Sequence, residues 1–118
     1  MMVLTVAILS VAISGAALAT STAIVNGTSA GDHIKGTAKA DTIHGKGGND
    51  AIHGMGGNDL LFGDDGHDGL YGGPGNDTVI AIGDAPGDFV DCGAGTDTVQ
   101  RSFRSEHDVF VNCERFTS

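Results

Sequence analysis

The stretch GGPGNDTVI, Gly72 to Ile80, places an aspartate behind three glycines and a proline. Nearly the same arrangement, GKGGND and GMGGND, occurs at Gly45–Asp50 and Gly54–Asp59. Glycine favours backbone conformations that other residues avoid, and aspartate is rarely buried in an apolar core. The stretch therefore indicates a tight turn that is used several times.

The turn recurs with a period of nine residues. Each aspartate is followed two positions later by an aliphatic residue, and glycine opens six consecutive lines of the repeat. The register slips by two residues through AIGDAPGD and then resumes. Nine residues are two and a half helical turns, so an amphipathic helix is excluded. The repeated pairs are Asp32/Ile34, Asp41/Ile43, Asp50/Ile52, Asp59/Leu61, Asp68/Leu70, Asp77/Val79, Asp88/Val90 and Asp97/Val99.

The composition restricts the class of protein. The 118 residues include 20 glycines but no tryptophan, one tyrosine and five phenylalanines. Fifteen acidic against six basic residues give a net charge of -9, which disfavours binding to nucleic acid or anionic lipid and favours cations. Such a composition is typical of a disordered linker. Only the periodicity argues for an ordered fold.

The repeat resembles the haemolysin-type calcium-binding (RTX) family, whose pattern is G-G-x-G-x-D-x-U-x. GGPGNDTVI fits every defined position, and the resemblance extends over Gly27–Gln100. It implies an all-β fold: a right-handed parallel β-roll, or β-helix, of nonapeptide repeats. Six-residue turns would alternate with three-residue strands, and calcium would bind between the turns.

The chemistry of the residues agrees with that implication. Calcium takes six to eight oxygen ligands and combines carboxylates with backbone carbonyls. Two lines make one coil, so Asp32, Asp50, Asp68 and Asp88 should lie on one side and Asp41, Asp59, Asp77 and Asp97 on the other. The expected ligands are these eight aspartates and backbone oxygens at Gly45, Gly47, Gly54, Gly56, Gly63, Gly72 and Gly75.

The turns are not equally convincing as ion sites. Asp59/Asp77 and Asp50/Asp68 have the fullest glycine pattern, whereas GTSAGD and GTAKAD are weaker and GDAPGD contains the insertion. The alternative for any single aspartate is an Asx-turn, in which the side chain bonds to its own backbone. Like charges stacked at about 5 Å would repel each other without a cation, so the stack favours metal.

The two ends of the chain differ from the repeats. Residues 1–19, possibly to 23, have the apolar run and Ala17-Leu18-Ala19 site of a secretory signal peptide, although no basic residue precedes Lys35. A retained membrane anchor is the alternative. Residues 20–26 would be a short linker or edge, 27–100 the repeats and 101–118 a C-terminal cap.

Cys92 and Cys113 are the two cysteines. An even count in a small exported chain suggests a disulfide, which would stabilise the C-terminal end by about 3 kcal/mol. Two buried free thiols are the alternative, while a zinc site is disfavoured by the shortage of soft ligands.

These patterns predict a secreted, non-enzymatic protein that folds on binding several calcium ions. We expect no nucleic-acid partner, no membrane association after signal cleavage, and a protein partner that the sequence does not identify. The alternative is a calcium-dependent adhesion or interaction module that uses Leu60, Phe62 and Ile80 on an outer sheet face. The histidines do not form a catalytic or zinc motif, since the expected coil sends His44 and His53 to opposite sheets.

Overall fold

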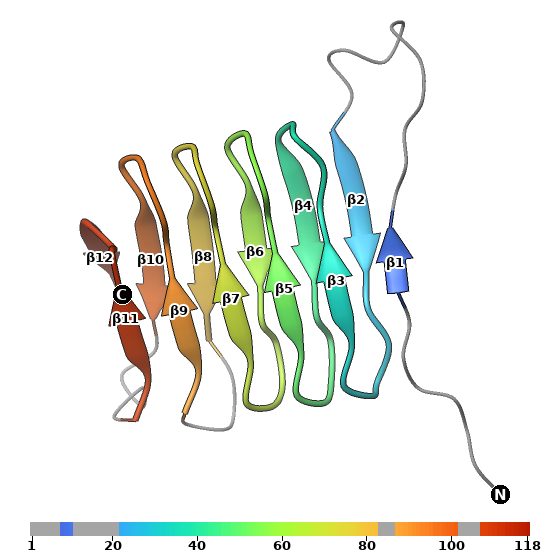
Figure 1. The fold of residues 1–118 in the computed structure, drawn as a ribbon. Helices are drawn as coiled ribbons and strands as arrows, with labels where there is room; N and C mark the ends of the chain where they lie inside the picture. Colours follow the sequence, from blue (N-terminus) through green and yellow to red (C-terminus); the bar gives the residue numbers. More distant parts are fainter. Residues whose placement is uncertain (1–7, 11–21, 83–86, 102–106) are drawn as a thin grey trace, which may run out of the picture.

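The computed structural model describes residues 8–10, 22–82, 87–101 and 107–118. These residues form two six-stranded sheets in which all neighbouring strands are parallel, and the chain alternates between the sheets (Figure 1). One sheet contains, in order, β1 (Ile8–Ser10), β3 (His33–Lys35), β5 (Ala51–His53), β7 (Gly69–Tyr71), β9 (Phe89–Asp91) and β11 (Val109–Val111). The other contains β2 (Ala23–Asn26), β4 (Asp41–His44), β6 (Leu60–Phe62), β8 (Thr78–Ala81), β10 (Thr98–Arg101) and β12 (Arg115–Thr117).

The core is a double row of aliphatic side chains between the sheets. Successive residues of a strand point to opposite faces, so a three-residue strand turns only its middle side chain inward. The eight aliphatic residues of the repeat are all 0% exposed: Ile34, Ile43, Ile52, Leu61, Leu70, Val79, Val90 and Val99. The predicted all-β roll of nonapeptide repeats is confirmed.

The turns at the ends of the strands require left-handed backbone. In GGPGND the second and fourth residues, Gly73 and Gly75, have φ of 90° and 133°. A Cβ at Gly75 would also collide with the carbonyl oxygen of Gly57 in the preceding coil, so glycine is needed there for space as well as for conformation. Lys46, Met55 and Asp64 adopt positive φ without being glycine, at the second position of their turns.

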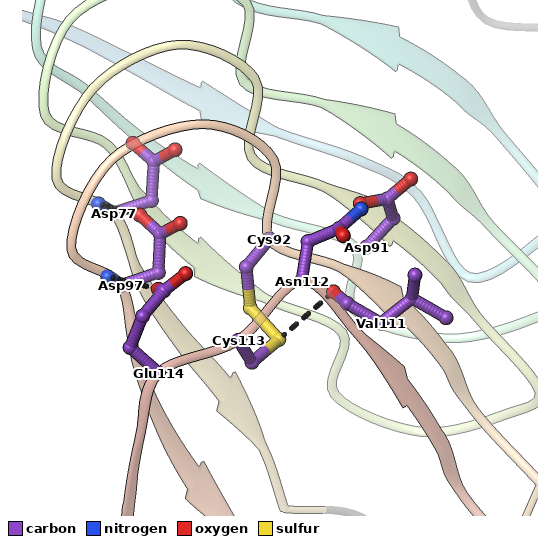
Figure 2. The surroundings of a disulfide bond; sticks show 8 residues. All are labelled: Asp77, Asp91, Cys92, Asp97, Val111, Asn112, Cys113 and Glu114. Atoms are coloured by element: carbon purple, nitrogen blue, oxygen red, sulfur yellow. Dashed lines mark hydrogen bonds between the residues drawn. A yellow bond between two sulfur atoms is a disulfide. The ribbon is translucent and has the colours of Figure 1, made fainter.

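The C-terminal end continues the roll beyond the last glycine-rich turn. β11 pairs with β9 and β12 pairs with β10, and Phe110 packs against the core. A disulfide joins Cys92 to Cys113 with a Cα–Cα distance of 5.2 Å, as the sequence predicted (Figure 2). Asn112 donates a side-chain hydrogen bond of 2.9 Å to Asp91 beside it. The cap is therefore a further coil, fastened covalently to the one before.

The predicted signal peptide lies largely outside the described residues. Its described part, β1, pairs in parallel with β3 and extends that sheet by one strand. Within the described ranges there is no helix with the length and hydropathy needed to cross a bilayer. β2 follows directly as the edge strand of the other sheet, with Ala23 and Val25 buried. Cleavage after residue 19 stays a prediction.

Replacing both cysteines by alanine should lower the free energy of unfolding of the calcium-loaded protein by about 3 kcal/mol, because the bridge closes a loop of 21 residues. Denaturant unfolding in excess calcium measures this difference. The calcium response should persist, because the Cys92 carbonyl oxygen that lies beside Gly72 and Asp77 belongs to the backbone and is kept in alanine. Loss of all calcium response would contradict this assignment of a purely structural role.

Candidate metal centre

The eight aspartates of the repeat form two buried columns, one along each line of turns. All eight are between 0% and 4% exposed. The backbone N–H of each aspartate except Asp97 donates to Oδ1 of the aspartate one coil further on, as in Asp41 to Asp59 at 2.9 Å and Asp59 to Asp77 at 2.8 Å. The predicted division into two sides is confirmed. Every carboxylate of the repeat except that of Asp32 thus accepts a hydrogen bond from the preceding coil.

The hydrogen bonds between stacked aspartates continue across the two-residue insertion in AIGDAPGD. Asp68 N–H donates to Asp88 Oδ1 at 2.9 Å across a separation of 20 residues instead of 18. The hydrogen-bonded column thus survives the two extra residues, although residues 83–86 of that turn lie outside the described ranges. Whether an ion binds between Asp68 and Asp88 stays a prediction.

Two further acids extend the columns and were missed in the sequence. Asp88 N–H donates to Asp108 Oδ1 at 2.9 Å, and Asp97 N–H donates to Glu114 Oε2 at 2.8 Å. Figure 2 shows Asp77, Asp97 and Glu114 one above the other. Both acids could have been found from the sequence, because each is followed two residues later by a phenylalanine, Phe110 or Phe116, where the repeat has its aliphatic residue.

The second carboxylate oxygen separates seven of the eight aspartates, all but Asp88, into two groups. In Asp32 and Asp41 it accepts hydrogen bonds from a threonine of the same turn. In the other group it is buried and has no hydrogen-bond partner, although an unpaired buried carboxylate oxygen is costly. This group consists of Asp50, Asp59, Asp68, Asp77 and Asp97.

Backbone oxygens converge on these unpaired atoms. A Cβ built on Gly54 would lie 2.5 Å from Asp59 Oδ2 and 2.8 Å from the carbonyl oxygen of Gly72 in the next coil. A Cβ on Gly45 would likewise lie 2.5 Å from Asp50 Oδ2 and 2.6 Å from the Gly63 carbonyl oxygen. Any side chain at the first position of these turns would fill the space beside the carboxylate. Glycine keeps that space open.

The donor set fits a hard cation. Among the described residues, no group of three or more His, Cys, Asp or Glu side chains is arranged to hold a metal. A site here must therefore combine carboxylate oxygens with backbone carbonyls, as calcium accepts and zinc rarely does. The contacts place the carbonyl oxygens of Gly63 and Gly72 near Asp50 and Asp59, and those of Gly45 and Gly54 near Asp32 and Asp41. Ligation of an ion by any of the predicted glycines, including Gly47, Gly56 and Gly75, stays a prediction.

Burial raises the pKa values of six carboxyl groups in the columns: Asp50, Asp59, Asp68, Asp77, Asp88 and Asp97. Loss of hydration is the main cause, and the hydrogen bond to the backbone of the preceding aspartate only partly opposes it. The pKa rises from 3.8 to about 7 for Asp59 and Asp68 and to about 6 for Asp50 and Asp77. Neighbouring aspartates raise these pKa values further. In the metal-free fold these carboxyl groups therefore ionise only as the pH approaches neutrality.

Sequence comparison supports the same donor chemistry. The profile of the RTX calcium-binding nonapeptide repeat family (4 copies) matches residues 26–61 and again residues 44–79. Residues 26–79 carry RTX calcium-binding repeats. No curated protein sequence and no solved structure matches it significantly. RTX repeats bind calcium, and the buried aspartate columns fit that chemistry.

A ladder of asparagines accompanies the RTX columns and was also missed. Asn49 Oδ1 accepts a hydrogen bond from His67 N–H at 3.0 Å, and Asn58 Oδ1 accepts one from Asn76 N–H at 2.8 Å. Asn76 Oδ1 in turn accepts from Thr96 N–H at 2.9 Å. The recurring Asn-Asp pair in the sequence could have indicated this ladder. The asparagine Oδ1 accepts a backbone N–H from the following coil, and the aspartate Oδ1 accepts one from the preceding coil.

The remaining polar residues lie away from the columns. His44 and His53 lie on different sheets, as predicted. His44 Nδ1 is 3.6 Å from Asp64 Oδ2. The same oxygen accepts a hydrogen bond of 3.1 Å from Lys46 N–H, so Asp64 links its own coil to the preceding one at the surface. Asp65 is exposed, and Asp84 is outside the described residues.

Acid should partly replace calcium in folding the chain. Because the folded pKa values of about 6 to 7 exceed the ordinary 3.8, the carboxyl groups' contribution to stability is complete below about pH 4 and is lost as the pH rises through 6 to 7. In chelator, we expect the far-UV β signal to grow as the pH falls from about 8 to about 5. Asp59→Asn, which cannot ionise, should weaken this dependence. A β signal that shrinks on acidification would contradict the assignment.

Proposed function

We propose that this protein is an extracellular, non-enzymatic calcium-binding roll that folds when calcium enters its turns. One observation carries the proposal: the five buried Oδ2 atoms without hydrogen-bond partners. Each is a ligand of the kind calcium prefers, in a position where a carboxylate is otherwise unfavourable.

Folding and binding are coupled through charge. At neutral pH, compaction brings the carboxylates of each column together at about the strand spacing of 5 Å. Bound calcium supplies the opposing charge and replaces the lost water ligands. The aliphatic core adds only one side chain per strand, which is small against the entropy of ordering a glycine-rich chain. The metal-free chain is therefore largely unfolded at neutral pH.

The coupling of folding to calcium binding would keep the chain unfolded until it has been exported. The apolar leader and the disulfide both favour a compartment outside the cytosol, where oxidised cysteines persist. Extracellular calcium-binding modules work with dissociation constants of about 10⁻⁴ to 10⁻³ M. The chain would then cross the membrane unfolded and fold after export. No catalytic constellation is needed for this role.

Calcium titration of the full chain, starting in chelator at neutral pH, tests the proposal by far-UV circular dichroism. We expect a change from coil to β signal with calcium and little change with magnesium, which demands octahedral geometry and gives up water reluctantly. A full β signal in chelator, or an equal response to magnesium, would overturn the proposal.

Asp77→Ala should raise the calcium concentration at the midpoint of folding about ten- to a hundredfold, since losing a charged hydrogen-bond acceptor costs about 1.5 to 3 kcal/mol. Asp77 is 1% exposed and accepts from Asp59 N–H. Asp65→Ala is the matched control, because Asp65 carries the same charge in an exposed position and should leave the midpoint unchanged. Equal shifts would show that only net charge matters.

A calcium-dependent interaction module is a second candidate. Phe89, Val109 and Val111 are 37%, 51% and 37% exposed on the adjacent strands β9 and β11, and the Tyr71 ring lies 5.8 Å from that of Phe89. On the other sheet, Leu60, Phe62 and Ile80 face outward but are only partly exposed. The first of these surfaces is therefore the better contact surface.

Light scattering after size-exclusion chromatography tests this second candidate. Self-association in calcium that is lost in chelator and in Phe89→Ser, but kept in Thr78→Ser, would support it. A monomer under all conditions would leave self-association without support.

A further inference from the structure

We propose that Thr28 and Thr37 close the first coil (residues 27–44) against calcium, so that this coil is completed by hydrogen bonds alone. This inference rests on the proposed function and assigns which turns carry it out. It makes the first coil a metal-free layer between the strands β1 and β2 and the calcium-binding coils.

The turns fall into two conformational classes. The five turns that end at Asp50, Asp59, Asp68, Asp77 and Asp97 have left-handed backbone at their second and fourth positions. We call these the glycine turns. The turns Gly27–Asp32 and Gly36–Asp41 have threonine at the second position and no positive φ at either position. We call these the threonine turns.

This division coincides with the state of the carboxylates. In every glycine turn the aspartate Oδ2 is buried without a partner. In both threonine turns it is partnered: Thr37 donates to Asp41 Oδ2 from its N–H at 2.5 Å and from its hydroxyl at 2.9 Å. Thr28 makes the same two bonds to Asp32, at 2.5 Å and 2.9 Å. Two independent turns thus have the same arrangement.

The threonine also fixes the rest of its turn. Its hydroxyl accepts a hydrogen bond of 3.1 Å from the N–H two residues later, at Ala30 in one turn and Lys39 in the other. The hydroxyl proton therefore points to the carboxylate while its oxygen holds the backbone. A turn closed in this way does not need the left-handed residues of the glycine turns.

These donors and a cation compete for the same oxygen. Two hydrogens point at the Oδ2 atom of Asp32 and of Asp41, where a calcium ion would need a free lone pair and would meet their positive ends. Binding an ion would require both bonds to break and the second residue to move to positive φ. That conformation is costly for threonine, which is β-branched. Calcium is thus excluded by chemistry and by backbone conformation together.

A matched pair of substitutions tests the assignment in the full chain. Native mass spectrometry in excess calcium counts bound ions, with far-UV circular dichroism as an independent readout of folding. Asp41→Asn should leave the number of ions and the calcium midpoint unchanged, because Asp41 is already satisfied by Thr37. Asp59→Asn, in the next turn of the same column, should lose at least one ion.

A gain-of-site variant provides the stronger test. Thr28→Gly with Ala30→Gly converts GTSAGD to GGSGGD, which removes the hydroxyl and permits left-handed backbone at both positions. We expect one additional calcium ion per chain. Thr28→Ser keeps the hydroxyl and should bind the same number of ions as the unaltered chain.

The outcomes separate this inference from the proposed function. If the unaltered chain binds no calcium, the proposed function is wrong and the inference falls with it. If the unaltered chain binds calcium but Asp41→Asn loses an ion, the inference alone is wrong. It is also overturned if the folded double variant gains no ion. Should the double variant fail to fold, the comparison of Asp41→Asn with Asp59→Asn decides.

Discussion

Stacked, buried aspartates are the constraint on which the rest of this structure depends. In the glycine turns each carboxylate accepts a backbone N–H of the preceding coil with one oxygen and leaves the other unpaired. The coils are thereby aligned by the groups that repel one another when charged. A cation between them converts the repulsion into attraction, which is why order and ion binding belong together in this fold.

Glycine and aspartate have complementary tasks in the turns. A side chain at Gly54 would occupy the space next to Asp59 Oδ2, and one at Gly75 would strike the preceding coil. The glycines thus bring successive backbones close enough for carbonyl oxygens to approach the carboxylates. The high glycine content, which in another chain would indicate disorder, here serves a packing requirement.

Much of this arrangement was predictable because the repeat is encoded locally. A nine-residue period with one aliphatic side chain per line determines a two-sheet roll, and Asp50, Asp59 and Asp77 were placed correctly by counting. Asp108 and Glu114 were not found, because phenylalanine replaces the aliphatic residue and glycine is absent from their turns. The role of Thr28 was also missed: Thr28 and Thr37 repeat at nine residues, but the sequence does not show that their hydroxyls bond to the carboxylates.

The two-residue insertion between Asp77 and Asp88 has a consequence for the fidelity of assembly. A stack of identical coils has no unique alignment, because sliding one part past another by a whole coil recreates nearly the same contacts. The insertion makes one coil 20 residues long where its predecessors have 18, so a slipped stack would set an enlarged turn against a small one. The insertion thus favours one alignment of the coils over the slipped ones, so that a periodic sequence folds to a single structure.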